Sequence, residues 1–152
     1  MSLIYDAPRF GLKGSAAVAW LEAQGIAVPP QANRWIALGD EGRILRLGRG
    51  EFLIEGAPAQ TLAAIWQDGQ PGLYRVPRYD AGFLLEGDTV PALLAEICAL
   101  DTRPQVIGGQ VLLTLAAGIS VTLLCEAGPR YRLWCDATYG HYLERTLREI
   151  LE

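Results

Sequence analysis

The residues of this chain that are best placed to do chemistry are two carboxylates, each two positions from an arginine. Asp80 follows Arg78, and Asp101 precedes Arg103. A carboxylate held in this way can accept a hydrogen bond from a ring N–H or steer an amine. For Asp80 the simpler explanation is an ion pair or a turn where a strand begins, because most charged side chains only solvate a surface. Asp101 could contact a partner chain or a ligand, or form a self-contained turn, and the sequence leaves both open.

The other potentially reactive side chains, three cysteines and one histidine, are expected to have structural rather than catalytic roles. Cys98, Cys125 and Cys135 form an odd set without CxxC spacing, so they predict neither a disulfide framework nor a zinc site, and we expect them to be buried. His141 has no second histidine with which to bind a metal. We expect His141 to be a surface or capping residue at the start of a helix rather than a catalytic base.

Aromatic side chains could anchor a subunit interface, where Trp and Arg are enriched. Trp20 and Trp66 lie on the inward stripes of expected helices, and we interpret them as core residues. Trp134 alternates with Leu133 and Cys135 along an expected strand, so it should face away from the side that these two residues bury. Trp134 is therefore the expected partner-facing aromatic.

Glycine-rich motifs give no sign of a nucleotide site. The sequence has no GxGxxG after a strand, no GxxxxGK[ST] and no GxSxG. Gly48-Arg49-Gly50 lacks a third glycine and a following helix, so it predicts a tight hairpin turn rather than a phosphate-binding loop. From these motifs we assign no catalytic, cofactor-binding or metal-binding residue.

Apolar periodicity and turn residues predict a mixed α+β chain that would position these side chains. In the first half we expect a strand over 9–12, a helix capped by Ser15 and stopped by Gly25, strands over 35–38, 44–47 and 51–54, and a helix from Pro58 that breaks at 68–72. In the second half we expect a strand over 82–85, a helix over about 89–99, an exposed loop over 101–109, strands over 111–115, 119–125 and 131–135, and a last helix capped by Asp136.

The two halves repeat one plan of strand, glycine and helix. RFGLKGS begins the first copy and YDAGFLLEGD the second, which pairs Phe10 with Phe83 and Gly14 with Gly87. Two copies are too few for a solenoid, and 152 residues that are 51% hydrophobic suit one core rather than two. We therefore predict a single α+β domain, residues 1–152, built from two pseudo-symmetric β-α-β-β-β-α units over about 7–70 and 73–152.

Charge and apolar runs narrow the choice of partners. The formal charge is −4, and the 13 basic residues are mostly scattered, which argues against binding to nucleic acid. No apolar run approaches the roughly 20 residues that span a bilayer, and the first residues lack the basic flank of a signal peptide. We therefore expect no membrane partner and a cytoplasmic location.

Four segments together resemble one known family. They are RFGLKG, LRLGRGEFLIEG, YRVPRYDAGFLLEG and YRLWCDATYGHYL, and the similarity spans nearly the whole chain. They are similar to the gamma subunit of heterotetrameric sarcosine oxidase. That family is similar in turn to the folate-binding domain of the glycine-cleavage aminomethyltransferase, and the β-α-β-β-β-α order is compatible with such a domain.

The resemblance implies a mainly architectural, non-catalytic subunit of a flavoenzyme that oxidatively demethylates sarcosine to glycine. The one-carbon unit would pass to tetrahydrofolate or leave as formaldehyde, with hydrogen peroxide as co-product. Larger alpha and beta subunits and a small delta subunit would be the partners, and FAD, FMN, NAD and tetrahydrofolate would bind to them rather than to this chain.

The sequence also leaves other functions open. The small subunit of N-methylglutamate dehydrogenase is comparable, and the motifs do not separate the two families. A free-standing folate-binding or aminomethyltransferase-like protein, with a ligand in a cleft between the repeats, is a rival, as is a structural relic without a ligand. An isolated chain could also form a homodimer through surfaces meant for its partners.

Overall fold

The computed structural model describes residues 4–151, which fall into two compact units. The first unit is residues 7–78, and the second unit is residues 79–151 with the N-terminal segment up to Asp6. Each unit has its own cluster of buried apolar side chains, whereas chain length predicted one core. The reason is that each sheet covers an apolar face with helices of its own unit. Among the described residues, no helix is long and apolar enough to cross a bilayer.

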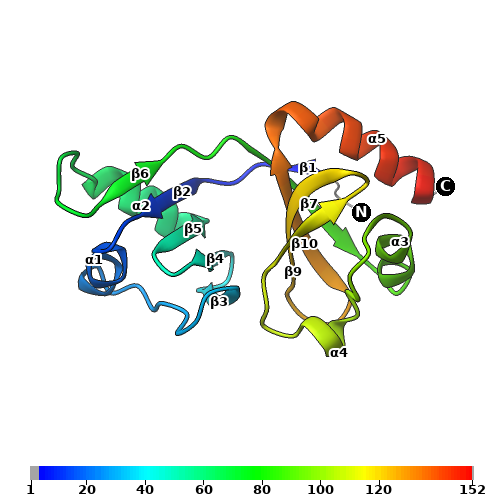
Figure 1. Ribbon diagram of the computed structural model, residues 1–152, viewed down its shortest axis with the longest axis horizontal. Helices are drawn as coiled ribbons and strands as arrows, with labels where there is room; N and C mark the ends of the chain where they lie inside the picture. The colour runs from blue at the N-terminus through cyan, green and yellow to red at the C-terminus, as the bar shows by residue number, and fades with distance from the viewer. Residues whose placement is uncertain (1–3, 152) are drawn as a thin grey trace. The chain divides into compact units, whose positions relative to one another are not determined.

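The first unit is a five-stranded antiparallel sheet with two helices packed on one face (Figure 1). The strand order across the sheet is β3-β4-β5-β2-β6. In chain order the elements are β2 (Arg9–Lys13), α1 (Ala17–Ala23), β3 (Arg34–Leu38), β4 (Gly42–Gly48), β5 (Glu51–Glu55), α2 (Ala57–Ile65) and β6 (Tyr74–Val76).

Alternation along β5 shows how this sheet is buried. Phe52 and Ile54 join the core beneath α1 and α2, while Leu53 and Glu55 point to the opposite face. All four side chains are at most 1% exposed, so both faces of this strand are buried. On the helix side, the ring of Phe10 lies 6.0 Å from that of Trp20 and 5.8 Å from that of Trp66. Both tryptophans pack against the core, which confirms their interpretation from the sequence.

The start of α1 differs from the prediction. Ala16 occupies the N-cap position, and no side chain caps the helix. The N–H of Ala16 donates to the carbonyl of Gly72 at 3.1 Å and that of Ala17 to the carbonyl of Gly14 at 3.2 Å, so backbone carbonyls rather than a side chain satisfy these amides at the start of the helix. Ser15 therefore remains in the loop before the helix and does not cap it.

The second unit is also a five-stranded antiparallel sheet, with strand order β1-β7-β10-β9-β8 (Figure 1). Helices α3 and α5 both contribute to its core. In chain order the elements are β1 (Ile4–Tyr5), β7 (Asp80–Glu86), α3 (Val90–Ile97), α4 (Pro104–Ile107), β8 (Leu112–Ala116), β9 (Ile119–Cys125), β10 (Arg130–Asp136), the 3-10 turn η1 (Ala137–Tyr139) and α5 (Gly140–Leu151).

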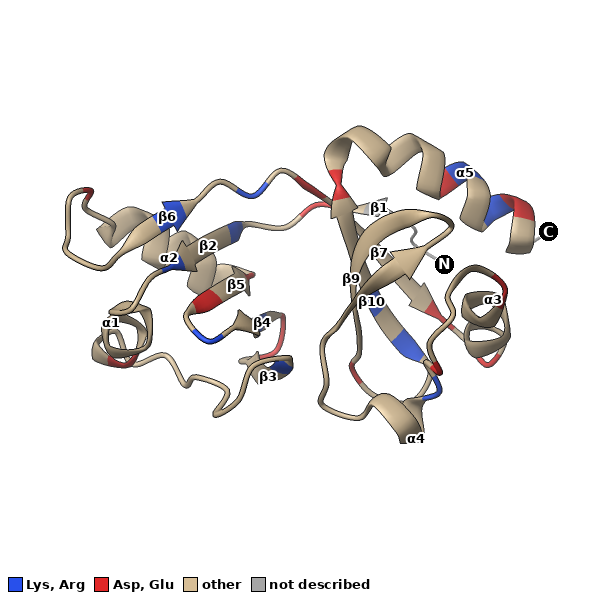
Figure 2. Ribbon diagram, viewed as in Figure 1, with Lys and Arg blue, Asp and Glu red and all other residues tan. Residues whose placement is uncertain are grey.

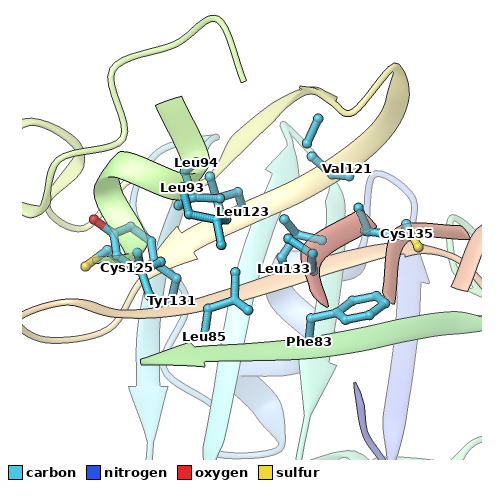
Figure 3. Close-up of a cluster of buried hydrophobic side chains, with 14 of the residues drawn as sticks. Phe83, Leu85, Leu93, Leu94, Val121, Leu123, Cys125, Tyr131, Leu133 and Cys135 are labelled. Atoms are coloured by element: carbon cyan, nitrogen blue, oxygen red, sulfur yellow. The ribbon is translucent and has the colours of Figure 1, made fainter. Parts of the chain in front are cut away.

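Figure 3 shows the core of the second unit, where side chains of β7, β9 and β10 meet those of α3. Leu85, Leu94 and Leu133 are fully buried in it. Tyr131 also lies in this core, and its hydroxyl donates to the carbonyl of Thr102 at 2.7 Å. Burial of a phenol disfavours its charged form, which raises the pKa of Tyr131 to about 12.

The order strand, helix, three strands, helix occurs once in each unit, and the strands pair in the same order. Gly14 and Gly87, at the ends of β2 and β7, both have positive φ angles, 135° and 127°. The two short strands were not predicted: β6 pairs with β2, so the first unit continues past the expected break at 68–72, and β1 pairs with β7. A short helix, α4, forms inside the expected loop over 101–109, with Pro104 in its first turn.

Candidate functional site

Two of the residues singled out from the sequence, Asp80 and Trp134, line one cavity of about 580 Å³ in the second unit. We call it the carboxylate cavity. Its wall is the outer face of β8, β9 and β10, on the side of the sheet away from α3 and α5. Besides these two residues, its lining includes Leu113, Leu115, Ser120, Thr122, Cys135 and Asp136.

Sheet register brings these residues together from distant parts of the chain. Leu113 lies directly opposite Thr122, which in turn lies opposite Trp134, so the three form a row across β8, β9 and β10. Asp80 lies directly opposite Asp136 across β7 and β10. Asp136 was not predicted as a cavity residue, because its expected role was only that of a helix cap.

Asp136 and Cys135, neighbours on β10, differ in protonation at neutral pH: the carboxyl group is ionised and the thiol is protonated. The Asp136 carboxylate accepts hydrogen bonds from the Thr138 amide at 2.9 Å and the Thr138 hydroxyl at 2.7 Å, which lowers the pKa of Asp136. Burial, together with the nearby Asp136 and Asp80, raises the pKa of the Cys135 thiol to about 11. The cavity therefore offers carboxylate and hydroxyl acceptors, while the protonated Cys135 thiol belongs to the core on the other face of the sheet.

This arrangement can accept hydrogen bonds and attract a cation. Ser120 is exposed on β9 and has no histidine beside it in the lining, so the lining holds no activated hydroxyl nucleophile. Asp136 caps η1 as well as lining the cavity, with α5 following directly, so its predicted capping role is confirmed for the short turn that begins that helix.

Asp101 and Arg103 form a self-contained turn, the second of the two explanations left open by the sequence. The Asp101 carboxylate accepts hydrogen bonds from the Arg103 backbone N–H at 3.1 Å and from its Nη2 at 2.6 Å. These contacts lower the pKa of Asp101, and the same hydrogen bond raises that of Arg103. Their side chains are 44% and 60% exposed, so the pair remains accessible to a partner although each charge is already neutralised.

Arg78 and Asp80 lie on either side of the boundary between the units. The aliphatic carbons of Arg78 pack where Gly11 has no side chain, because an added Cβ on Gly11 would lie 2.9 Å from Arg78 Cγ. Both charged groups have interacting partners. A role for either of them in contacting a ligand or a partner stays a prediction.

Trp134 does not present an exposed ring to a partner. Tyr131 and Leu133 belong to the core while Trp134 points to the opposite face, as alternation predicted. Its side chain is nevertheless only 1% exposed. Its neighbours on this part of the face are buried as well: Leu124 and Arg132, also outside the core cluster, are 0% and 5% exposed.

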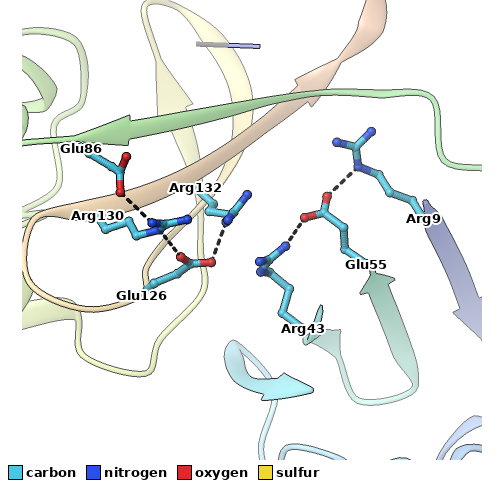
Figure 4. A network of polar contacts seen from close by, with 7 residues as sticks. All are labelled: Arg9, Arg43, Glu55, Glu86, Glu126, Arg130 and Arg132. Atoms are coloured by element: carbon cyan, nitrogen blue, oxygen red, sulfur yellow. Dashed lines mark hydrogen bonds and ion pairs between the residues drawn. The ribbon is translucent and has the colours of Figure 1, made fainter. Parts of the chain in front are cut away.

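Two ion-pair networks were missed from the sequence (Figure 4). In the first unit, the buried carboxylate of Glu55 accepts from Arg9 Nε at 2.8 Å and from Arg43 Nη1. Both arginines lie directly opposite Glu55 on the flanking strands β2 and β4. The expected strand over 51–54 ended one residue too early to include Glu55, although the hairpin at Gly48-Arg49-Gly50 was the signal that fixes this register.

The network of the second unit joins neighbouring strand ends. Glu126 accepts from Arg130 Nε at 2.7 Å and from Arg132 Nε at 2.6 Å, while Arg130 Nη1 donates to Glu86 at 2.7 Å. The Arg132 guanidinium also lies 4.8 Å from the centre of the Tyr5 ring. Lys and Arg positions are otherwise spread along the ribbon of both units rather than gathered on one element (Figure 2).

The cysteines and the histidine lie as predicted. Cys98, Cys125 and Cys135 are free thiols and are each at most 6% exposed. His141 is exposed on α5 beside Glu144 and other charged side chains. Within residues 4–151, no group of three or more His, Cys, Asp or Glu side chains could hold a metal ion.

Comparison with solved structures relates the fold to a known enzyme. The chain matches a chain of "Heterotetrameric Sarcosine Oxidase from Corynebacterium sp. U-96 in complex with pyrrole 2-carboxylate" with a TM-score of 0.73. The match covers 95% of this chain and 80% of that chain, at 23% sequence identity. No protein-family model and no curated protein matches the sequence. The two chains therefore share a fold, which is the fold expected from the resemblance found in the sequence.

Proposed function

We propose that this chain is a gamma-like accessory subunit of a sarcosine oxidase-type flavoenzyme. The observation that supports the proposal is the match of 95% of the chain to a chain of a heterotetrameric sarcosine oxidase. Such a complex would demethylate sarcosine oxidatively to glycine, with the one-carbon unit passing to tetrahydrofolate or leaving as formaldehyde. The proposal includes the interpretation of the chain as two pseudo-symmetric copies of one unit, like the aminomethyltransferase folate-binding domain.

The proposed division of labour assigns shape and contact surface to this chain. Larger alpha and beta subunits and a small delta subunit, located in the cytoplasm, would bind FAD, FMN, NAD and tetrahydrofolate. The local geometry is compatible with this role, because the Cys135 thiol next to the cavity is buried in the core and its pKa is raised to about 11, so it is protonated at neutral pH and is not a nucleophile.

Co-purification tests the proposal directly. The tagged chain is expressed together with the proteins encoded beside its gene, and the captured material is examined for flavin absorbance and for sarcosine-dependent peroxide formation. We expect capture of flavin-containing chains in fixed stoichiometry. The same neighbours expressed without the tagged chain provide the control. Recovery of the tagged chain alone would contradict the proposal, and turnover with N-methylglutamate instead of sarcosine would favour the related dehydrogenase.

The carboxylate cavity supports one rival function, a free-standing folate-binding protein. Asp80 and Asp136 could accept hydrogen bonds from the ring N–H groups of a pterin, and about 580 Å³ is within the range of small-molecule sites. Calorimetry with tetrahydrofolate on the purified chain separates the two functions. The subunit proposal expects no saturable binding, whereas the rival expects a site that Asp80→Asn weakens and Asp101→Asn, outside the cavity, leaves unchanged.

A further inference from the structure

A second cavity, of about 610 Å³, lies in the first unit and plays no part in the proposed function. It forms where the loop after β2 meets the hairpin between β4 and β5. Three cationic side chains line it, from Lys13, Arg46 and Arg49, together with one carboxylate, that of Glu51. We call it the basic cavity. Its positive character contrasts with the net charge of −4 of the whole chain.

Glycines hold the walls of this cavity in fixed, close contact. The Gly14 N–H donates to the Gly50 carbonyl at 2.9 Å. A Cβ added to Gly50 would lie 2.7 Å from the Gly14 carbonyl oxygen, and one added to Gly14 would lie 1.9 Å from that of Gly72. Only glycine allows these backbones to approach so closely. The two loops are therefore positioned by backbone contacts rather than by flexible side chains.

Arg46 fixes the hairpin from the other side. Its Nη1 donates to the Pro29 carbonyl at 2.8 Å and its Nη2 to the Arg49 carbonyl at 2.6 Å, while its guanidinium lies 5.4 Å from the centre of the Phe52 ring. Within the described residues, its buried Nε has no hydrogen-bond partner. Arg46 thus holds the backbone of Arg49 in place and leaves the Arg49 side chain to solvent.

The two remaining cations are available for a ligand. Lys13 and Arg49 are exposed, and neither forms an ion pair with any residue that the structure describes. Lys13 lies directly opposite Glu51 across β2 and β5, yet their side chains do not form an ion pair. With one carboxylate against three cations, the lining has an excess of two positive charges.

The second unit contains the same loop pair in a neutralised form. There the Gly87 N–H donates to the Pro129 carbonyl at 3.1 Å, which corresponds to the 2.9 Å bond of the first unit. The cross-strand pair at this position is Glu86 with Arg130, and the two side chains form an ion pair at 2.7 Å. Glu126 binds the same arginine at 2.7 Å. One scaffold therefore pairs its charges in one unit and leaves its cations unpaired in the other.

We propose that the basic cavity binds a small organic oxyanion, a phosphate or carboxylate group, through Lys13 and Arg49. Arg46 acts as a positioning residue that orients the hairpin. Charge-assisted hydrogen bonds to such groups are among the strongest in proteins, and the cavity volume is within the range of small-molecule sites. The Glu51 carboxylate limits the excess charge and could pair with an ammonium or hydroxyl group elsewhere on the ligand.

Binding of two probe anions to the purified full-length chain tests this proposal. Inorganic pyrophosphate represents phosphate groups and succinate represents carboxylates, with sodium chloride at matched ionic strength as the reference. We expect saturable binding of at least one probe by calorimetry, and a rise in Tm with its concentration. Arg49→Glu and Lys13→Glu should each weaken binding, which means that each raises the dissociation constant about tenfold or more. Arg49 contributes only its backbone carbonyl to the hairpin, so its substitution should not disturb folding.

Arg145→Glu is the matched control. Arg145 is exposed on α5 in the second unit, and its substitution changes the net charge by the same amount. It should leave binding unchanged. Binding of pyrophosphate but not succinate identifies phosphate as the recognised group, and binding of succinate but not pyrophosphate identifies carboxylate. Binding of neither probe, or equal weakening by Arg49→Glu and Arg145→Glu, would overturn the proposal. Because the assay uses this chain alone, its result is independent of whether flavin-bearing partners exist.

Discussion

Replacement of Glu55 by glutamine tests how the first unit is held together. Glu55 is fully buried, and the side chains of Arg9 and Arg43 that bind it are only 8% and 5% exposed. At an effective dielectric constant of about 20, two unit charges 4 Å apart interact by about 4 kcal/mol. Much of this attraction offsets the cost of burying the charges, but removal of one partner leaves the others buried. We therefore expect Glu55→Gln, which preserves shape, to lower the free energy of unfolding by about 3–5 kcal/mol.

Urea denaturation gives the measurement, followed by far-UV circular dichroism and tryptophan fluorescence. Glu144→Gln is the matched control, because Glu144 pairs with Arg148 at 3.0 Å on the exposed surface of α5. That pair lies four residues apart on a helix, so its loss should cost only about 0.5 kcal/mol or less. The same chemical change thus probes a buried and an exposed ion pair. Equal losses in the two variants would refute the argument that burial of the Glu55 network makes it stabilising.

Three further predictions follow from local geometry. Gly50→Ala should destabilise the chain by about 1–3 kcal/mol in urea denaturation, since its Cβ would lie 2.7 Å from the Gly14 oxygen, whereas Gly48→Ala, with its nearest neighbour at 3.7 Å, should be tolerated. Alkaline pH should destabilise the second unit: the pKa values of Cys135 and Tyr131 are raised to about 11 and about 12, so the folded state keeps protons that the unfolded state releases. The free energy of unfolding should be unchanged below about pH 9 and should then fall by up to about 1.4 kcal/mol per pH unit for each group. Urea midpoints measured across this pH range give the slope. Cys135→Ala should remove the part of the slope that comes from Cys135. The three buried thiols should react with a thiol reagent only after denaturation, and rapid labelling of native protein would contradict their burial.

The strands and helices of both units could be predicted because their signals are local. Ile119, Val121 and Leu123 alternate with the polar Ser120 and Thr122, and the observed strand covers the expected range. The short strands β1 and β6 carry no such signal, since each has at most three residues and exists only because a longer strand lies beside it. The start of α1 was likewise not predictable from local sequence, because a distant carbonyl, that of Gly72, accepts a hydrogen bond from the Ala16 amide and no side chain caps the helix.

The candidate sites were harder to predict, because they depend on which residues of different strands lie opposite one another. Asp80 and Asp136 are far apart in the sequence and become neighbours only through the pairing of β7 with β10. Trp134 shows the same limit of local patterns: alternation correctly assigned its face, but it could not show that Trp134 is buried on that face. Asp101 and Arg103 could be interpreted as a turn because their contacts are local, two residues apart.

Comparison of the two units explains why a repeat in the sequence predicts the scaffold better than the function. The glycines that set loop geometry match, as Gly14 and Gly87 show, because both have a positive φ angle that a side chain would strain; at Gly14 an added Cβ would also clash with the Gly72 carbonyl. The exposed ends of the same strands carry no such constraint, so Lys13 in one unit corresponds to Glu86 in the other. In the second unit this position forms an ion pair with Arg130, while in the first unit the cation has no ion-pair partner among the described residues. The proposed difference in ligand binding between the units would therefore arise from side chains that the fold itself leaves free to vary.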